Sequence, residues 1–270
     1  MIRLIAVDMD GTLLRSDKTM SLFSEEAIRK AAGSGAGVVF CTGRSWSELL
    51  PFFPRLPEMR YAVCQSGAFL YDLTEDRCLF RRSLPEEVVA EVVRIGEEED
   101  VILQVMSGKH NVIPGPLLPR FPEYHMEPYL PLYRSTGTLV RSTVDFLKEH
   151  PKEADKINIW HLSQEARERT IARLRPFRAE KANAEAANYE LTPEGTDKGS
   201  GLAALCKNLN IHREEVCAIG DNENDLPMFR EASLRIAMGN AVPSVKAAAD
   251  RICEDNDSDG CAKAILSLLS

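Results

Sequence analysis

The sequence predicts an α/β protein with a doubly wound parallel sheet. Its short apolar runs lack polar interruptions, as is typical of strands buried on both faces, and helical patterns alternate with them. The alternation stops once, between residues 84 and 190, and then resumes. We therefore predict a discontinuous Rossmann-like core formed by residues 1–83 and 191–270, with an α+β domain inserted at residues 84–190.

The first part of the core predicts strands at residues 4–7, 38–42 and 61–65 and a hairpin at residues 69–80. Ser24 is the expected cap of the first helix, because Glu25 and Glu26 follow it where the helix dipole favours acids. Ser45 and Glu48 have the spacing of a capping box, which predicts a further helix after the second strand.

The same patterns predict the elements of the insertion and of the second part of the core. In the insertion we expect a helix from Pro85, a strand at 101–106, a proline-rich stretch without one long element, a strand at 156–162, a helix at 163–174 and one or two strands within 177–191. In the second part of the core we expect a helix at 198–209, a strand at 216–219, a helix from Leu226, a strand at 234–237 and helices at 244–249 and 261–269.

The composition is that of an ordinary globular protein and argues against several functional classes. Of the 270 residues, 44% are hydrophobic and 27% are charged, and the net charge of −8 argues against broad nucleic-acid binding, which needs a basic surface. No apolar run reaches the roughly 20 residues that cross a bilayer, and no signal peptide is recognised, so we expect a cytoplasmic protein without membrane contact. The seven cysteines are scattered and are expected to be reduced thiols.

Polar residues gather at the carboxyl ends of predicted strands, which is the edge where open α/β sheets bind ligands. Asp8 and Asp10 follow the first strand, although alone they fit a polar turn as well as a functional site. Thr42 and Gly43 follow the second strand, and alone they are typical of a plain loop. Their joint occurrence with further polar residues downstream is what favours a site.

Those further residues are Lys198, which opens a predicted helix, and Asp221, Asn224 and Asp225, which follow the strand at residues 216–219. Three or four acids at one sheet edge would repel one another unless a hard cation lay among them, and such oxygen ligands suit Mg²⁺. In proteins Mg²⁺ usually binds a few carboxylates together with a substrate phosphate, to which Lys198 would add a second positive charge. The sequence therefore predicts a Mg²⁺ site that binds a small phosphorylated metabolite.

Four of these segments together resemble the motifs of the haloacid dehalogenase superfamily. They are Asp-Met-Asp-Gly-Thr-Leu at residues 8–13, Thr-Gly-Arg at 42–44, Gly-Thr-Asp-Lys-Gly at 195–199 and Gly-Asp-Asn-Glu-Asn-Asp at 220–225. Two segments of the tail, Ala-Met-Gly-Asn-Ala at residues 237–241 and Asp-Gly-Cys-Ala at 259–262, resemble the Cof-type sugar-phosphate phosphatase branch. The resemblance covers both halves of the core in the correct order and is weak across the insertion.

The resemblance implies a role for each matching residue. Asp8 would be the nucleophile that forms an aspartyl-phosphate, and Asp10 would protonate the leaving alcohol and later activate water. The metal ligands would be the Asp8 carboxylate, the Asp10 backbone carbonyl and Asp221. Asp225 would orient Lys198 or a metal-bound water. The groups that hold phosphate oxygens would be the Met9 and Gly43 amides, Thr42, Lys198 and Asn224.

The resemblance also narrows the reaction and the type of insertion. The dehalogenases of the superfamily lack the second acid of the first motif, whereas Asp10 is present here, so a phosphatase is expected. About 30 residues separate Thr12 from Thr42, too few for a cap domain, whereas about 156 separate Thr42 from Lys198. The insertion therefore resembles the subtype IIB cap, to which substrate specificity is assigned.

Three functions are compatible with these patterns. The favoured one is a Mg²⁺-dependent phosphatase that hydrolyses sugar phosphates or similar metabolites through an aspartyl-phosphate. The alternatives are a phosphomutase of the same superfamily and a phosphometabolite sensor without turnover, which the presence of both Asp8 and Asp10 disfavours. One position departs from the family pattern: Ser66-Gly67 replaces the common Asn-Gly after the third strand, so a side-chain contact to substrate there is in doubt. The sequence patterns identify no protein partner.

Overall fold

A computed structural model of the chain describes residues 1–184 and 187–269. Glu185 and Ala186, within the segment predicted to hold strands at residues 177–191, and Ser270 lie outside the described residues. The contacts divide the chain into two compact units. The first comprises Met1–Gly43, Pro51–Phe80 and Asp197–Ser270, and the second comprises Arg44–Leu50 and Arg81–Thr196. The domain boundaries at residues 84 and 190 stay a prediction.

The first unit is built on an eight-stranded sheet in the order β14-β13-β12-β1-β2-β3-β4-β5. The strands are β1 (Leu4–Val7), β2 (Gly37–Cys41), β3 (Tyr61–Cys64), β4 (Phe69–Asp72), β5 (Arg77–Arg81), β12 (Val216–Gly220), β13 (Leu234–Ala237) and β14 (Arg251–Ile252). From β14 to β3 the neighbouring strands run parallel, and β4 pairs with β3 antiparallel. All four residues of β1 are buried, since it lies between two parallel neighbours. The predicted α/β fold with a doubly wound sheet is confirmed.

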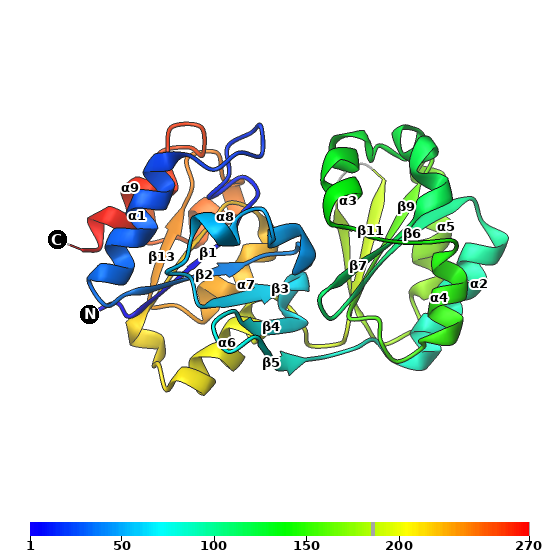
Figure 1. Cartoon of the computed structure of the whole chain (residues 1–270), viewed down its shortest axis with the longest axis horizontal. Helices are drawn as coiled ribbons and strands as arrows, with labels where there is room; N and C mark the ends of the chain where they lie inside the picture. Colours follow the sequence, from blue (N-terminus) through cyan, green and yellow to red (C-terminus); the bar gives the residue numbers. More distant parts are fainter. Residues whose placement is uncertain (185–186, 270) are drawn as a thin grey trace. The chain divides into compact units, whose positions relative to one another are not determined.

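Helices cover both faces of this sheet. They are α1 (Leu22–Gly33), α6 (Lys198–Leu209), α7 (Leu226–Arg230), α8 (Pro243–Ala248) and α9 (Gly260–Ser267). Helix α1 packs beside α9, as Figure 1 also shows, whereas α7 packs against both α6 and α8. The chain moves outward from β1 in opposite directions through β2 and through β13, and crossovers between parallel strands are right-handed. The two groups of helices therefore lie on opposite faces, and the carboxyl ends of the parallel strands form one common edge.

The second unit contains a six-stranded sheet in the order β10-β11-β9-β6-β7-β8. Its strands are β6 (Val101–Ser107), β7 (His110–Pro114), β8 (Thr138–Val140), β9 (Lys156–His161), β10 (Glu180–Ala184) and β11 (Asn188–Thr192). The helices of this unit are α2 (Glu86–Glu98), α3 (Leu130–Thr136), α4 (Thr143–Glu149) and α5 (Gln164–Leu174). Strand β9 pairs antiparallel with β6 and β11, as do β6 with β7 and β10 with β11, whereas β7 and β8 are parallel. This arrangement is the α+β architecture expected for the insertion.

Two apolar clusters hold the second unit together, one on each face of its sheet. On one face, Leu103, Val105, Ile157 and Ile159 alternate along β6 and β9 and pack with apolar side chains of α2, α4 and α5. On the other face, Trp160 packs with aromatic residues from the proline-rich stretch, which forms 3₁₀ turns at Gly115–Tyr124 and Glu127–Tyr129 before α3. The prolines explain why no long element forms there.

Two local predictions are wrong. Helix α1 begins at Leu22, and its N-cap is Ser21, whose hydroxyl accepts a hydrogen bond from the Ser24 amide at 3.0 Å. Ser24 itself lies inside the first turn. The capping box at Ser45 and Glu48 does form, since the Glu48 carboxylate accepts the Ser45 amide at 2.7 Å, but only 3₁₀ turns at Ser47–Leu49 and Phe53–Arg55 follow. Prolines at positions 51 and 54 stop an α-helix from propagating.

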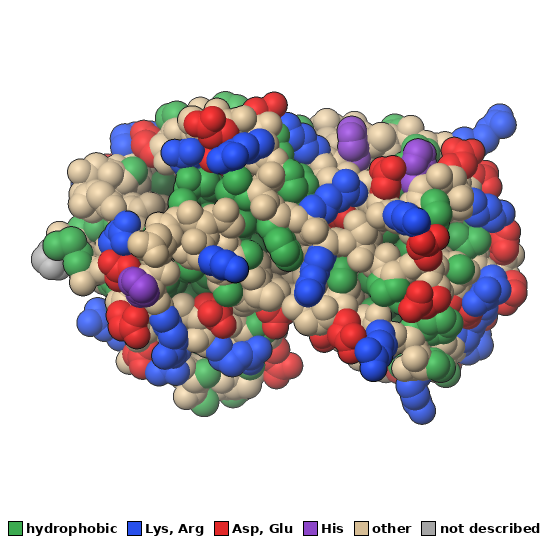
Figure 2. All heavy atoms as spheres, turned by 90° about the horizontal axis from the view of Figure 1, so that it is seen from below, with side chains coloured by type: hydrophobic (Ala, Val, Ile, Leu, Met, Phe, Trp, Pro, Cys, Tyr) green, Lys and Arg blue, Asp and Glu red, His purple; other side chains and the backbone are tan. Residues whose placement is uncertain are grey.

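On the face drawn in Figure 2, acidic and basic side chains lie interspersed. In both units charged side chains form ion pairs, such as Arg235 with Asp250 at 2.6 Å and Arg173 with Glu91 at 2.7 Å. Within the described part of the chain, no helix has both the length and the apolar character that crossing a bilayer requires.

Candidate active site

The site begins where β1 ends. The amide of Asp8 continues the parallel ladder by donating to the Ile219 carbonyl of β12 at 3.1 Å. Asp8 is 5% exposed, so its carboxylate is held at the sheet edge by a strand that is buried on both sides. A carboxylate in such a place needs compensating charge, because burial alone disfavours its ionised form.

A tight turn brings the residues after Asp8 onto the loop that follows β12. Gly11 has a φ of +80°, and a Cβ atom there would lie 2.4 Å from Oδ2 of Asp221, so only glycine permits this approach. The hydroxyl of Thr12 donates to Oδ1 of Asp221 at 2.7 Å. Asp8, Gly11, Thr12 and Asp221 therefore form one connected group, although the last of them is distant in sequence.

Lys198 provides the cation of this group. It is the first residue of α6, whose N-cap Asp197 accepts the Ser200 amide at 2.7 Å. The Lys198 side chain is 1% exposed, and its Nζ lies 2.7 Å from Oδ1 of Asp8 and 2.7 Å from Oδ1 of Asp225. One buried ammonium thus joins the ends of β1 and β12.

Asp225 is held by the loop that carries it. Its Oδ2 accepts the amides of Asp221 at 2.8 Å and Asn222 at 3.0 Å, while its Oδ1 accepts from Lys198. A Cβ atom on Gly220 would lie 2.6 Å from the Asp225 carboxylate, which explains the glycine at the end of β12. Both oxygens of Asp225 are therefore engaged, one of them by Lys198, and the orienting role predicted for Asp225 stays a prediction.

The carboxylates of Asp8, Asp221 and Asp225 offer ligand oxygens that all lie within 4.8 Å of one another. Burial raises the pKa of Asp8 well above its ordinary value, with Lys198 opposing the rise and Asp225 adding to it. Burial also raises the pKa of Asp221 to about 6, against the hydrogen bond from Thr12. Burial would lower the pKa of Lys198, but Asp225 and Asp8 outweigh it, so this pKa lies above its ordinary value.

These observations fit a hard divalent cation. Three carboxylates lie close together, and the single ammonium of Lys198 contacts two of them, which leaves negative charge that a metal would neutralise. Oxygen-only ligands are the set that Mg²⁺ prefers. The residues present therefore fit the metal that the sequence predicts.

The carboxylate of Asp10 points elsewhere. Its Oδ1 lies 2.9 Å from Nζ of Lys18, and its side chain is 37% exposed. It is not one of the three acids whose ligand atoms lie together. The role predicted for Asp10 at the metal, through its backbone carbonyl, stays a prediction.

The predicted phosphate-binding residues lie at neighbouring strand ends. Thr42 follows β2, which pairs directly with β1, and is 1% exposed. Gly43 is the next residue, and Met9 lies in the turn after Asp8, with its carbonyl accepting the Leu14 amide at 2.8 Å. Asn224 is exposed on the loop after β12. Their predicted roles in holding phosphate stay predictions.

The turn after β3 supports Lys198. Gln65, Ser66 and Gly67 all have positive φ values, of 54°, 54° and 96°. A Cβ atom on Gly67 would lie 2.0 Å from the carbonyl oxygen of Asp197, and the Ser66 amide donates to the Thr42 carbonyl at 3.0 Å. The strained turn is thus packed between the end of β2 and the start of α6. Sequence reasoning treated it only as a possible substrate contact.

Sequence reasoning also assigned no function to Thr12 and Lys18. Thr12 lies in the first motif, but its bond to Asp221 joins residues far apart in the chain. Lys18 follows Asp10 by eight positions, on a turn that no periodicity marks. The residues Ser, Asp, Lys and Thr at positions 16–19 are typical of a turn, and this composition is the signal that could have predicted it.

Comparison with known proteins gives consistent matches along nearly the whole chain. The family model of haloacid dehalogenase-like hydrolases matches residues 5–265. Phosphatase YwpJ of Bacillus subtilis (strain 168) is 29% identical over 296 residues, which cover 99% of this chain and 100% of that protein. From the same organism, 5-amino-6-(5-phospho-D-ribitylamino)uracil phosphatase YitU is 29% identical over 271 residues, covering 96% and 95% of the two chains.

A solved structure agrees with these matches. The crystal structure of a haloacid dehalogenase-like hydrolase from Bacteroides thetaiotaomicron superposes with a TM-score of 0.87 at 28% sequence identity. The superposition covers 99% of this chain and 100% of the other. The similarity therefore extends over both compact units.

Proposed function

Because this chain belongs to the haloacid dehalogenase-like hydrolases, we propose that it is a Mg²⁺-dependent phosphomonoesterase that acts on small phosphorylated metabolites through an aspartyl-phosphate. The superfamily assignment made from the sequence motifs is confirmed, and the chain is an enzyme of the hydrolase class. One observation carries the proposal. The buried ammonium of Lys198 lies between Asp8 and Asp225, and the carboxylate oxygens of Asp8, Asp221 and Asp225 lie within 4.8 Å of one another.

In the proposed first step, a carboxylate oxygen of Asp8 attacks the phosphorus atom and forms an acyl-phosphate bond. The bond between phosphorus and the leaving oxygen breaks, and Asp10 donates a proton to that oxygen so that a neutral alcohol leaves. Lys198, which contacts Asp8 at 2.7 Å, would neutralise charge on the transferring phosphoryl group.

In the proposed second step, water attacks the phosphorus atom of the aspartyl-phosphate. Asp10 accepts the proton of that water, and the bond to Asp8 breaks. Inorganic phosphate is released and the Asp8 carboxylate is restored, so the cycle consumes one water and one phosphomonoester. Asp10 suits both steps because its side chain is partly exposed, unlike the buried Asp8.

We assign the metal to the carboxylates of Asp8 and Asp221 and the backbone carbonyl of Asp10. When bound, Mg²⁺ would neutralise charge on the phosphoryl oxygens. The raised pKa of Asp221, at about 6, supports this assignment, because the carboxylate is partly buried and Thr12 donates to it without bringing a positive charge. We do not assign Asp225 to the metal, because its two oxygens already accept hydrogen bonds from Lys198 and from two backbone amides.

The phosphate oxygens would be held by the hydroxyl of Thr42, the amides of Met9 and Gly43, and Asn224. The parallel pairing of β1 with β2 supports the first three, because residues at the carboxyl ends of adjacent strands share one edge. Asn224 follows the strand on the other side of β1.

The proposed substrates are sugar phosphates or similar metabolites. The relatives' names support a small phosphorylated molecule, since YitU is named for a phosphorylated ribityl compound. We propose that residues 84–190 form the cap that selects the substrate. Free thiols at the seven cysteines agree with a reducing compartment and support a cytoplasmic place of action.

The decisive experiment replaces Asp8 by Asn and measures hydrolysis of p-nitrophenyl phosphate with Mg²⁺ and with excess chelator. We expect the variant and the chelated wild type to lose turnover, because the nucleophile or the charge compensation is missing. Asp250→Asn is the matched control, since this exposed acid, just before β14, pairs with Arg235 of β13 and receives the same chemical change. Turnover by Asp8→Asn at the wild-type rate would overturn the proposal.

A second measurement tests the intermediate and the substrate class. Rapid acid quenching after addition of a ³²P-labelled substrate should leave label on the wild-type protein that hydroxylamine removes, and no label on Asp8→Asn. A panel of sugar phosphates, nucleotides and pyridoxal phosphate, assayed for released phosphate, then ranks the substrates.

A further inference from the structure

The turn that follows the first motif presents a cation to Asp10. Nζ of Lys18 lies 2.9 Å from Oδ1 of Asp10, and the two side chains are 50% and 37% exposed. Lys18 has a φ of +65°, a left-handed conformation that non-glycine residues adopt only at a cost. The surrounding structure must therefore hold Lys18 in this conformation.

The turn is first held by its own hydrogen bonds. The amide of Arg15 donates to the Thr19 carbonyl at 2.9 Å, and the Lys18 amide donates to the Arg15 carbonyl at 2.8 Å. The Asp17 carboxylate accepts both the amide of Thr19 at 2.9 Å and its hydroxyl at 2.6 Å. These bonds close a compact turn with Lys18 near its tip.

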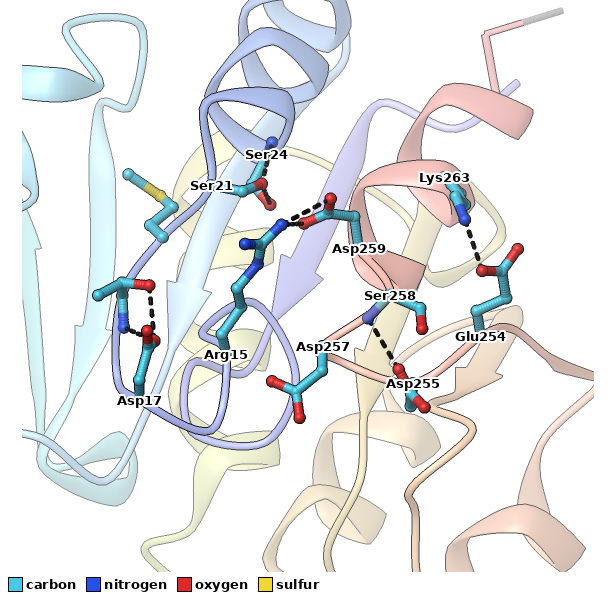
Figure 3. A network of polar contacts seen from close by, with 12 residues as sticks. Arg15, Asp17, Ser21, Ser24, Glu254, Asp255, Asp257, Ser258, Asp259 and Lys263 are labelled. Atoms are coloured by element: carbon cyan, nitrogen blue, oxygen red, sulfur yellow. Dashed lines mark hydrogen bonds and ion pairs between the residues drawn. The ribbon is translucent and has the colours of Figure 1, made fainter.

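The C-terminal segment holds the same turn from outside, as Figure 3 shows for Arg15 and Asp259. Arg15 donates twice to the Asp259 carboxylate, at 3.1 and 3.0 Å. Ser16 donates its amide and its hydroxyl to Asp257, at 2.9 and 2.7 Å. The C-terminal segment that includes Asp257 and Asp259 takes no part in the reaction steps above. It therefore serves to fix the turn that carries Lys18.

Two amide side chains extend this anchorage toward the motif itself. Asn240 donates to the Gly11 carbonyl at 2.8 Å, and Asn256 donates to the Leu14 carbonyl at 3.0 Å. The backbone between Asp10 and Lys18 is therefore tied to the tail at both ends. The C-terminal segment therefore holds in place the backbone that carries the ion pair between Asp10 and Lys18.

The Asp10 carboxylate must be held in position because Asp10 lies only two residues from Asp8. The carboxylates of Asp8, Asp221 and Asp225 already lie together, and a fourth carboxylate turned among them would bind the cation instead of moving protons. Lys18 attracts the Asp10 carboxylate away from that group.

We propose that Lys18 is a positioning residue that keeps the Asp10 carboxylate outside the acidic group and available for proton transfer. The inference rests on the proposed phosphatase function. An exposed ion pair contributes little to folding stability, so removing Lys18 should leave a folded protein. The variant should instead lose catalytic rate in the step that needs Asp10.

The test compares two phosphomonoesters that differ in the need for a general acid. The p-nitrophenolate ion leaves readily without a proton, whereas the alkoxide from an alkyl phosphate such as glycerol 3-phosphate must be protonated. We expect Lys18→Met to lower kcat for the alkyl phosphate by on the order of tenfold, a fraction of what general acid catalysis contributes. Release of p-nitrophenolate in the first turnover, followed by stopped flow, should change less than about twofold, because that step needs no general acid. Steady-state turnover of either substrate also includes the second step, in which Asp10 acts as the base.

Lys18→Arg and Lys30→Met are the controls. Arginine keeps the cation and should restore most of the alkyl phosphate turnover. Lys30 forms a comparable exposed pair with Glu26, at 2.7 Å on α1, and its removal should affect neither substrate. Circular dichroism and the thermal midpoint should be the same for all variants.

The outcomes separate this inference from the proposed function. If wild-type protein hydrolyses both substrates and Lys18→Met slows the first turnover of both equally, or of neither, the positioning role is wrong while the phosphatase stands. If wild-type protein hydrolyses neither substrate in Mg²⁺, the proposed function itself fails. A selective loss that Lys18→Arg does not restore would also contradict positioning through charge.

Discussion

The hydroxyl of Thr12 donates a hydrogen bond of 2.7 Å to Oδ1 of Asp221, and so links the turn after β1 to the loop after β12. This bond favours the ionised form of Asp221, whose pKa burial raises to about 6. In Thr12→Val we expect that pKa to rise further, because the variant keeps the volume and loses the donor. Mg²⁺ activation should then need on the order of tenfold more metal, as for other residues that orient ligands.

The sign of the pH dependence follows from the same bond. Protons compete with Mg²⁺ for the carboxylate, so the defect of Thr12→Val should be larger at pH 6 than at pH 8. Mg²⁺ titrations of phosphate release at both pH values measure it, with Thr12→Ser as the variant that keeps the hydroxyl. An unchanged Mg²⁺ requirement in Thr12→Val would show that the bond does not serve the metal site.

Gly67 offers a separate test of how the site is supported. A Cβ atom there would meet the Asp197 carbonyl at 2.0 Å, so Gly67→Ala should displace the start of α6 and reduce both stability and turnover. Gly35→Ala is the matched control, because Gly35 has a similar φ of +89° with no atom within 4 Å of the added methyl. The control should lose about 1–2 kcal/mol of unfolding free energy through φ strain alone, and no activity. Equal losses in both variants would contradict the packing argument.

Lys198→Met should destabilise the protein by about 3–5 kcal/mol near neutral pH, because two buried carboxylates lose their shared cation. The pKa of Asp8, already raised, should rise further. An acid with a raised pKa in the folded state binds more protons folded than unfolded, so stability is lost as pH rises through that pKa. Urea unfolding should therefore show a smaller deficit at pH 5 than at pH 8.

A second substitution checks the cause. In Lys198→Met with Asp225→Asn, one of the two uncompensated carboxylates is gone, so the double variant should be more stable than Lys198→Met alone. If the second change only adds to the loss, the deficit arises from packing.

The sequence predicted the core of the site because that part depends on strand ends. The apolar runs of β1 and β12 predict buried parallel strands without further information. The acids that follow these strands must then lie at one edge of the sheet. The same reasoning placed Lys198 at a helix start, where the structure has it. No pairing between distant segments was needed for these predictions.

What the sequence did not predict depends on such pairings. The bond from Thr12 to Asp221 and the tail contacts of Arg15 and Ser16 exist only once the chain has folded. The short strands β7 and β8 also went unpredicted, because the proline-rich stretch between them hides the alternation of apolar residues. Helices α3 and α4 were missed as well, since seven residues are too few for a clear helical period. The predicted helix after Ser45 failed since a capping box can form without enough residues to propagate a helix.

The second unit allows a pH test that is independent of the site. His161 on β9 is fully buried, and its ring nitrogens lie 3.0 Å from the Ala187 carbonyl and 2.9 Å from the Thr170 hydroxyl. A neutral ring satisfies both, with Nδ1 donating to the carbonyl and Nε2 accepting from the hydroxyl.

Burial lowers the pKa of His161 below 6.5, so the unfolded chain binds a proton first and stability is lost as pH falls below 6.5. The slope should approach ~1.4 kcal/mol per pH unit at most, and His161→Gln should reduce it, whereas His110→Gln, at an exposed position, should not. Urea unfolding followed by tryptophan fluorescence reports this unit, because both tryptophans belong to it; an identical slope in His161→Gln would assign the acid sensitivity to other groups.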